Sequence, residues 1–246
     1  MTRPTKMKTI GILGGMSNQA TSEYYQMINE LVNQRLGGWE IAETLIQGLN
    51  FGNIEHYVRN GLWAEARSYI EAKAKGAELG GADMLICVSN TMHCVLDNIE
   101  NVVDIPFIHI SDPTGQAIQN AGLSKVGILG TKPVMEATYI KDRFKQNFNI
   151  DVISPNEADQ VSVDKIIFDE LVKRKITAAS KQAYIKVCEN LLAKGAQAII
   201  LGCTEIFLLL KPEDFPQAPL FNTAELHAHA AVDLALSEMK LKTAAQ

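Results

Sequence analysis

The 246-residue sequence lacks the features that mark nucleic-acid-binding and membrane-bound proteins. Its formal net charge is -5, and its longest run of like charge is Lys173-Arg174-Lys175, so it carries no basic footprint for a nucleic acid. No apolar stretch approaches the roughly 18 residues of a membrane span, and the first residues, MTRPTKMK, hold no apolar signal core. We therefore expect a cytoplasmic protein without a nucleic-acid or membrane partner.

Cysteine and histidine are sparse and not arranged as metal ligands. The four cysteines form no CxxC pair, and the five histidines form no HxxxH or HExxH pair on a predicted helix. A reducing compartment would keep the cysteines as thiols. We expect no metal site, and each thiol has to be considered by itself.

Short apolar runs alternate with longer segments of helical period, and this pattern predicts an α/β protein. Runs that are apolar throughout are typical of parallel strands covered on both faces. The predicted strands are IGIL (10–13), TLIQGL (44–49), MLICV (84–88), FIHI (107–110), VGILG (126–130), DVISP (151–155), AIILG (198–202) and PLFN (219–222).

The two halves of the chain resemble each other. KTIGILGG (8–15) matches SKVGILGT (124–131), and GADMLICVSNT (81–91) matches GAQAIILGCTE (195–205) without a gap, which places Ser89 opposite Cys203. A Tyr-Ile pair precedes, and a proline-led strand follows, each member of the second match. The order of these matches predicts two copies of one lobe.

Two homologous lobes can present similar groups to opposite sides of one ligand. In parallel sheets ligands bind beyond the carboxyl ends of the strands, where both Ser89 and Cys203 lie. The fold class that we predict is therefore α/β, with two pseudo-symmetric, doubly wound lobes of mainly parallel sheet and the active site in the cleft between them.

Cys203 is the first candidate for chemistry. It follows a strand and a glycine turn and precedes a predicted helix, whose dipole would lower the pKa of the thiol and favour the thiolate. The alternative is a small apolar filler, because free cysteine is often buried. Ser89 could likewise be only a helix cap, and as a weak acid it needs a neighbouring base to transfer protons.

Hydrogen-bond donors surround the same strand ends. Asn90, Thr91, Thr131 and Thr204 could each be a cap, but together with helix N-termini they would form a carboxylate cradle. GGMSNQATSEYY (14–25), which includes Met16, is a glycine turn into a helix but lacks both nucleotide-binding glycine motifs. Lys165, at the start of a predicted amphipathic helix, would by default be a solvated surface residue.

The other three cysteines are weaker candidates. Cys188 has helical spacing from apolar neighbours and is expected in the core, Cys87 is interior to its strand, and Cys94 lies one helical turn beyond Ser89.

Four motifs occur in order over essentially the whole chain: ILGGM, SNTMH, GILGT and LGCTEI. Together they resemble the aspartate/glutamate racemase family, and Glu205 after Cys203-Thr204 resembles its aspartate racemase branch. The resemblance implies a cofactor-independent isomerase with proton-transferring residues on both faces of the substrate Cα, here Ser89 and Cys203. By the same resemblance, the α-carboxylate would be held by Asn90, Thr91, Thr131 and Thr204. The substrate side chain would contact Lys165 and the IQGLNF segment, with Gln47 first. Met16 is included as a further substrate contact.

The family pattern also implies a lobe organisation and an assembly. The first lobe would comprise residues 1–105 and 218–246, the second lobe residues 106–217, and the protein would be a homodimer. Most members of the family have cysteine where this chain has Ser89, which predicts slow or directionally biased exchange.

The function that we predict is pyridoxal-independent racemisation of aspartate, glutamate or a similar small amino acid. Two alternatives stay open at this point. One is a malonate-type decarboxylase that uses Cys203 alone, and the other is a non-catalytic protein that binds small carboxylates.

Overall fold

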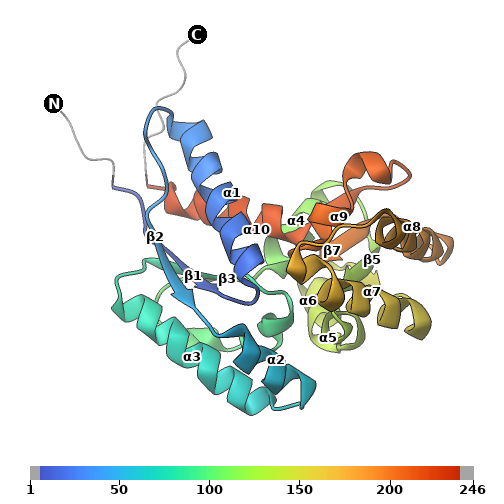
Figure 1. Cartoon of the computed structure of the whole chain (residues 1–246). Helices are drawn as coiled ribbons and strands as arrows, with labels where there is room; N and C mark the ends of the chain where they lie inside the picture. Colours follow the sequence, from blue (N-terminus) through green and yellow to red (C-terminus); the bar gives the residue numbers. More distant parts are fainter. Residues whose placement is uncertain (1–5, 239–246) are drawn as a thin grey trace, which may run out of the picture. The chain divides into compact units, whose positions relative to one another are not determined.

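The computed structural model describes residues 6–238, which alternate between strands and helices (Figure 1). They divide into two compact units. The first holds the described residues up to Val88, Val95–Ile108 and those from His227 onward; the second holds Ser89–Cys94 and His109–Leu226. No helix within residues 6–238 has the length and apolar character to cross a membrane.

The first unit is built on a parallel sheet in the order β2-β1-β3-β4. Its strands are β1 (Ile10–Gly14), β2 (Thr44–Gly48), β3 (Met84–Cys87) and β4 (Phe107–Ile108). Helix α3 (Trp63–Leu79) covers one face, α1 (Asn18–Leu36) and the greater part of α10 (Thr223–Ala235) cover the other, and α2 (Phe51–Arg59) packs on α3 (Figure 1). The 3-10 helix η2 (Ile99–Asn101) precedes β4.

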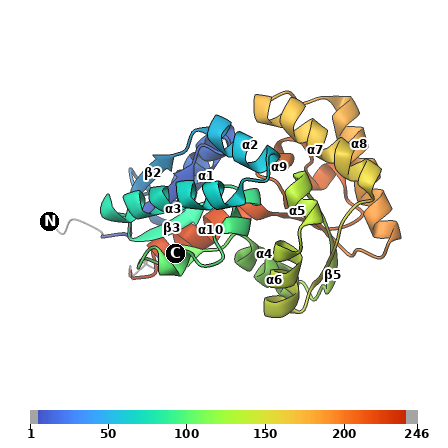
Figure 2. The same cartoon turned by 90° about the horizontal axis from the view of Figure 1, so that it is seen from below.

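The second unit repeats this plan with the strand order β6-β5-β7-β8, again all parallel. Its strands are β5 (Lys125–Gly130), β6 (Asp151–Ile153), β7 (Ile199–Gly202) and β8 (Leu220–Asn222). Helices α4 (Ser111–Asn120) and α6 (Thr138–Phe148) lie side by side, as do α7 (Glu157–Asp169) and α8 (Ala178–Ala193) (Figure 2). Shorter elements are η1 (Thr91–Val95), α5 (Lys132–Glu136), η3 (Leu171–Lys173), α9 (Ile206–Leu209) and η4 (Pro212–Asp214).

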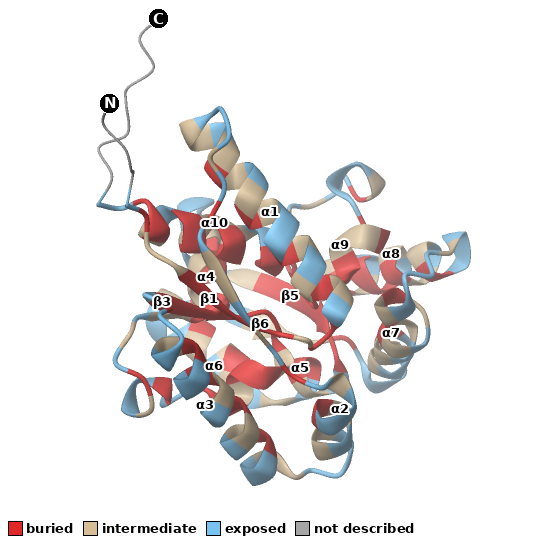
Figure 3. Ribbon diagram, turned by 60° about the vertical axis from the view of Figure 1, so that its left-hand side comes forward, coloured by how far each residue is buried: buried red, intermediate tan, exposed pale blue. Residues whose placement is uncertain are grey.

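Alternation of side chains along β5 and β7 explains why these strands are apolar throughout. Leu129, Ile199 and Leu201 belong to the core cluster beneath α7 and α8, whereas Ile128 and Ile200 belong to the cluster beneath α4 and α6. Successive residues point to opposite faces of a strand, so a strand covered on both sides must be apolar at every position. The buried strands β1, β3 and β5 show this in Figure 3.

The predicted α/β class, the eight strands and the internal repeat are confirmed. The two sheets have the same strand order when β1 corresponds to β5, and the matched glycines serve the same purpose. A Cβ at Gly11 would lie 2.8 Å from the Ala82 Cβ, and one at Gly127 would lie 2.8 Å from a methyl of Leu191. Each glycine therefore lets the central strand approach a neighbouring segment closely.

Strand pairing corrects the two predicted lobe boundaries. Phe107 of β4 pairs with Leu85 of β3, so β4 lies in the first sheet and not in the unit that we predicted to begin at residue 106. Leu220 of β8 pairs with Ile199 of β7, so β8 lies in the second sheet and not in the segment 218–246 that we gave to the first lobe. Each repeat keeps its fourth strand, and the chain changes unit after it.

Candidate functional site

Ser89 begins a segment that follows β3 but belongs to the second unit; we call residues Ser89–Cys94 the Ser89 segment. The Asn90 side-chain amide donates a hydrogen bond to Thr223 Oγ1 at 3.0 Å, and the Thr223 hydroxyl donates to the Leu201 carbonyl at 2.9 Å. Leu201 is two residues before Cys203 on β7. Two hydrogen bonds thus connect the residue next to Ser89 with the strand that presents Cys203.

Further hydrogen bonds hold the Ser89 segment on the second unit. The hydroxyls of Thr91 and Thr131 are 2.8 Å apart, and the Tyr139 hydroxyl donates to the carbonyls of Asn90 and Thr91 at 2.9 and 3.3 Å. The expected proximity of Thr91 and Thr131 is therefore observed. Tyr139, on α6, was missed by sequence reasoning because it lies outside every motif that we singled out.

The same hydrogen bonds leave donors in the Ser89 segment for a ligand. The carbonyls of Asn90 and Thr91 are engaged, but within residues 6–238 the backbone N–H groups of Asn90 and Thr91 donate to no other protein group. Asn90 is buried and Thr91 is partly buried, and buried backbone N–H groups nearly always find a partner. These two are suited to an anionic ligand, such as a carboxylate.

Ser89 itself is buried, and its hydroxyl oxygen accepts a hydrogen bond from the Met92 backbone N–H at 3.4 Å. This is the capping geometry that we considered as the alternative to a catalytic role. An accepting oxygen can still donate its own proton, so capping and proton transfer are compatible at this serine.

Cys203 follows β7 and is 7% exposed, and its thiol donates a hydrogen bond to Glu205 Oε2 at 3.1 Å. The Thr204 hydroxyl donates to the same carboxylate oxygen at 2.9 Å. Glu205 is itself buried, at 3% exposure. Sequence reasoning used Glu205 only as a marker of the family branch and missed this contact with the candidate catalytic thiol.

The surroundings of Cys203 reverse the expected direction of its pKa shift. Burial raises the pKa of the thiol well above its ordinary value, the Glu205 carboxylate raises it further, and a hydrogen bond from the Glu205 backbone opposes them. The prediction that a helix dipole favours the thiolate is wrong. Helix α9 begins three residues later, at Ile206, and has only four residues, which is too short for a substantial dipole.

Met16 and Gln47 belong to the first unit. Met16 is buried between Gly15 and Ser17, which caps α1 by accepting from the Ala20 backbone N–H at 3.2 Å. Gly15 has a φ of 86°, and a Cβ there would lie 2.2 Å from the Leu49 carbonyl. Only glycine fits this turn, in which the residue before Met16 lies against Leu49, the residue that follows β2.

Gln47 is a residue of β2, within the segment 44–49 that we predicted as a strand. It pairs with Leu13, and its side-chain amide lies against α3, 3.9 Å from where a Cβ at Gly76 would be. The β2 strand ends one residue beyond Gln47, at Gly48.

Lys165 is exposed near the carboxyl end of α7, which corrects the prediction that it starts a helix. The helix begins at Glu157 because Asn156 caps it, accepting from the Asp159 backbone N–H at 2.9 Å. The neighbouring Asp164 accepts from the Lys132 backbone N–H at 2.7 Å, so this part of α7 lies beside the start of α5.

The other three cysteines differ in how far they are buried. Cys188 is a residue of α8 that faces the core, as predicted, and burial raises its pKa to about 12. Cys87 is buried in β3, and Cys94 is partly exposed in η1. Among residues 6–238, no three His, Cys, Asp or Glu side chains gather in a way that could hold a metal ion.

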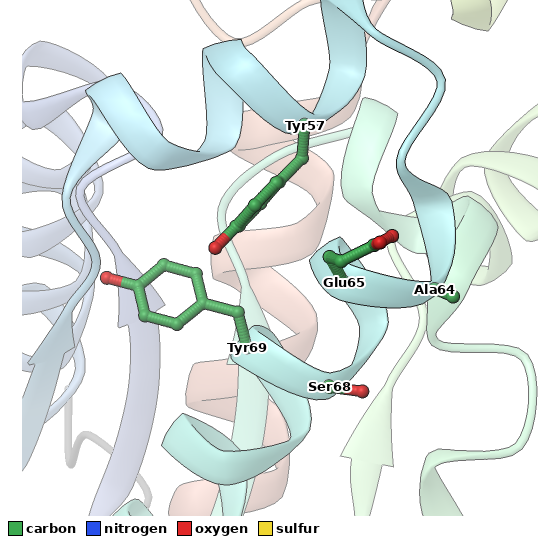
Figure 4. A pocket seen from close by; sticks show the side chains of 5 residues that line it. All are labelled: Tyr57, Ala64, Glu65, Ser68 and Tyr69. Carbon is green, nitrogen blue, oxygen red and sulfur yellow. The ribbon is translucent and has the colours of Figure 1, made fainter.

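A surface hollow of about 540 Å³ lies between α2 and α3 of the first unit, with Tyr57, Ala64, Glu65, Ser68 and Tyr69 around it (Figure 4). The two tyrosine rings meet edge to face, and the Tyr69 hydroxyl accepts from the Asn50 backbone N–H at 3.1 Å. None of the site residues predicted from the sequence lines this hollow.

Comparison with known proteins agrees with this architecture. The chain matches the family model described as Asp/Glu/Hydantoin racemase over residues 13–231. A crystal structure of a candidate Asp/Glu racemase from Yersinia pestis is 39% identical, with a TM-score of 0.86 covering 94% of this chain and 100% of that one. An aspartate racemase homologue from Pyrococcus horikoshii is 29% identical, with a TM-score of 0.80 covering 93% and 99%.

A curated relative adds a reaction class. The broad specificity amino-acid racemase RacX of Bacillus subtilis is 23% identical over 202 residues, which are 82% of this chain and 87% of that protein. The match of the family model extends from β1 into α10 and so includes both sheets and both candidate strand ends. The chain therefore belongs to the Asp/Glu/hydantoin racemase family, a membership that supports amino-acid racemisation as its general reaction.

Proposed function

We propose that this protein racemises aspartate, glutamate or a similar small acidic amino acid without a cofactor, with Cys203 and Ser89 as the two proton-transferring residues. The observation that carries the proposal is the buried Cys203 thiol hydrogen-bonded to the Glu205 carboxylate at 3.1 Å. A thiol in contact with a buried carboxylate has an internal acceptor for its proton. Such a thiol can become a base without exchanging its proton with bulk water.

The substrate α-carboxylate would bind the donors of the Ser89 segment. The unengaged N–H groups of Asn90 and Thr91 would supply two hydrogen bonds, and the Thr91 and Thr131 hydroxyls could reorient toward the ligand. Removing a proton from Cα places negative charge on the carboxylate. Donors fixed in this position stabilise the carbanion more than the substrate, which lowers the barrier.

The proton transfers would run as follows. The Cys203 proton passes to Glu205 Oε2, and the resulting thiolate removes the proton from one face of the substrate Cα. Ser89 Oγ–H then delivers its proton to the opposite face, which leaves a serine alkoxide, and the enzyme recovers its starting state when the alkoxide is reprotonated from solvent and Glu205 returns its proton to solvent. A serine alkoxide is much less stable than a thiolate.

This chemistry would be asymmetric between the two enantiomers. When Cys203 removes the Cα proton, it can return a proton to the same face before Ser89 acts. Exchange with retention would then exceed inversion for the enantiomer that Cys203 deprotonates. For the other enantiomer Ser89 would have to act as the base, and both exchange and inversion would be slow.

Recognition of the substrate side chain would fall to residues with suitable polar groups. Lys165, with an exposed ammonium on α7, would pair with the side-chain carboxylate. Gln47 and Met16 remain proposed contacts from the first unit, and Thr204, whose hydroxyl donates to Glu205, would support the carboxylate that accepts the thiol proton.

One observation favours the decarboxylase alternative. Burial and the Glu205 carboxylate raise the pKa of Cys203 and keep its thiol protonated at rest, so that Cys203 alone could serve as the proton donor. In that reaction loss of CO2 from a malonate-type substrate forms an enolate, and the protonated Cys203 thiol delivers the proton. A raised thiol pKa suits such a donor.

A single assay series distinguishes these functions. The purified protein is incubated with each enantiomer of a panel of amino acids and with substituted malonates, and optical rotation, deuterium incorporation at Cα and CO2 release are measured, with Cys203→Ser as the control. Racemisation or exchange that is lost in the control supports the proposal. CO2 release without exchange favours the decarboxylase, and binding without turnover refutes both.

A further inference from the structure

His93 is a buried residue of the Ser89 segment whose ring nitrogens both contact the backbone. It is 1% exposed, and its Nδ1 lies 2.8 Å from the carbonyl oxygen of Ser89, four residues earlier. The backbone N–H of Ile110 donates to Nε2 at 3.1 Å. None of the proton-transfer steps proposed above uses this side chain.

The two backbone partners determine the tautomer of His93. A carbonyl oxygen only accepts hydrogen bonds, so Nδ1 must carry a proton; an amide N–H only donates, so Nε2 must be unprotonated. The ring is therefore neutral with the proton on Nδ1. Either the other tautomer or the imidazolium would direct an N–H of the ring at the N–H of Ile110.

The ring is also held in place. Ile110 immediately precedes α4, so the contact ties the Ser89 carbonyl to the start of a ten-residue helix of the same unit. The His109 ring packs edge to face on His93, with centroids 4.4 Å apart at 66°. The Nδ1 of His109 accepts from the Ser111 backbone N–H at 3.2 Å, which anchors this second ring to α4 as well.

Fixing the Ser89 carbonyl also fixes the Asn90 N–H, because both belong to one planar peptide group. In a trans peptide the C=O and N–H bonds point in opposite directions. A hydrogen bond that pulls the carbonyl of Ser89 toward His93 therefore aims the N–H of Asn90 to the other side. That N–H donates to no other group within residues 6–238.

We infer that His93 is a positioning residue: its neutral ring orients the Ser89–Asn90 peptide so that the Asn90 N–H faces the substrate carboxylate and Ser89 keeps its place beside Cα. The inference rests on the proposed function. It assigns to the histidine of the SNTMH motif a role that depends on donating and accepting hydrogen bonds and not on filling space.

Two substitutions separate these roles. His93→Asn keeps a donor near the position of Nδ1 but leaves a gap, whereas His93→Phe fills the ring volume and removes both hydrogen bonds. We expect His93→Phe to lower kcat/KM for both enantiomers by about tenfold or more, the loss that accompanies one or two broken buried hydrogen bonds, and His93→Asn to stay within about fivefold. A ring that serves only packing would give the opposite order, and that result would overturn the inference.

The matched control is Met92→Leu, which changes the shape of the neighbouring buried side chain and nearly conserves its volume. Its kcat/KM is expected to stay within about twofold of that of the wild type. A tenfold loss in this control would show that η1 tolerates no change at all, and the effect of His93→Phe would then no longer support positioning.

A measurement on the wild-type protein tests the inference even if His93→Phe does not fold. Long-range 15N–1H correlation spectra of the histidine rings should show His93 neutral at pH 7, with the proton on Nδ1. A proton on Nε2, or a cationic ring, would overturn the inference. Absence of turnover in the wild type would instead refute the proposed function, while this spectrum would still decide the state of His93.

Discussion

The Cys203 thiol donates a hydrogen bond to the Glu205 carboxylate at 3.1 Å, and both side chains are buried. A thiol in this environment rests in its protonated form, because burial and the adjacent negative charge both raise its pKa. Glu205 Oε2 is also the acceptor of the hydrogen bond from this thiol. The same pair thus keeps Cys203 neutral at rest and offers a route to the thiolate.

Glu205→Gln should lower the pKa of Cys203 toward its ordinary value, because the substitution removes the negative charge that raises it. Peptide-resolved alkylation with iodoacetamide across a pH series measures this: the rise in Cys203 labelling should occur at lower pH in the variant. Cys188, whose raised pKa has burial as its main cause, is the internal control. An unchanged Cys203 profile would show that the carboxylate does not influence the thiol.

Glu205→Gln should also slow turnover by about tenfold to a thousandfold, because the thiol loses its proton acceptor; general acid–base groups contribute about that much. Binding of an unreactive dicarboxylate should change little, as measured by calorimetry. Full activity in the variant would contradict the proposed route for the proton.

Ser89→Cys should make exchange more symmetric. A thiolate forms far more readily than an alkoxide, so the slower of the two enantiomers should exchange at least tenfold faster in the variant. The rate for the enantiomer that Cys203 deprotonates should change by less than threefold. Solvent-deuterium exchange measured separately from each enantiomer is the test. Its control is Ser89→Ala, which should abolish exchange from the slower enantiomer and leave exchange with retention at the enantiomer that Cys203 deprotonates.

Lys165→Gln should raise KM for an acidic substrate by about tenfold or more, with a smaller effect on kcat, because the lost contact would be made equally in the substrate and the transition state. Steady-state kinetics with aspartate and glutamate provides the measurement. Lys173→Gln, at another lysine of the same unit, is a suitable control. Equal effects of the two substitutions would remove Lys165 from the substrate site.

The protein should lose stability in alkaline solution. Cys188 has an ordinary pKa of 9.0 and a folded-state pKa of about 12, so the unfolded chain releases the thiol proton first. The free energy of unfolding should therefore fall as pH rises from about 9 toward 12, since the stabilising contribution is complete only below the unfolded value. Urea denaturation at several pH values measures it, and Cys188→Ala should flatten the dependence although it lowers stability overall.

Much of the fold follows from local pattern. Each predicted strand is present. The reason is that a run of apolar residues bounded by turns is the pattern that a strand covered on both faces requires. The boundaries at 105/106 and 217/218 were wrong because they depend on which strand pairs with β4 and β8, and pairing is a long-range property.

Some contacts of the candidate site could likewise be predicted from the sequence, and others could not. Ser89 and Cys203 were singled out as candidates because the repeat aligns them, and Thr91 and Thr131 because they follow strand ends. Tyr139 was missed as a partner of the Ser89 segment, and His93 was missed as a partner of Ser89 within it, because each contacts backbone carbonyls, which leave no signature in a sequence. The start of α7 was misplaced for a different reason, since the Asn156 cap was not recognised.

The sequence by itself determined the α/β class, the duplication and the two strand ends where Ser89 and Cys203 lie, because apolar period and internal similarity are local or repeated signals. Only the tertiary structure decided the state of Cys203. A helix start after a cysteine suggests a thiolate, but burial and the Glu205 carboxylate make the neutral thiol more stable. Desolvation and charge depend on all neighbours in space, and those neighbours are set by folding.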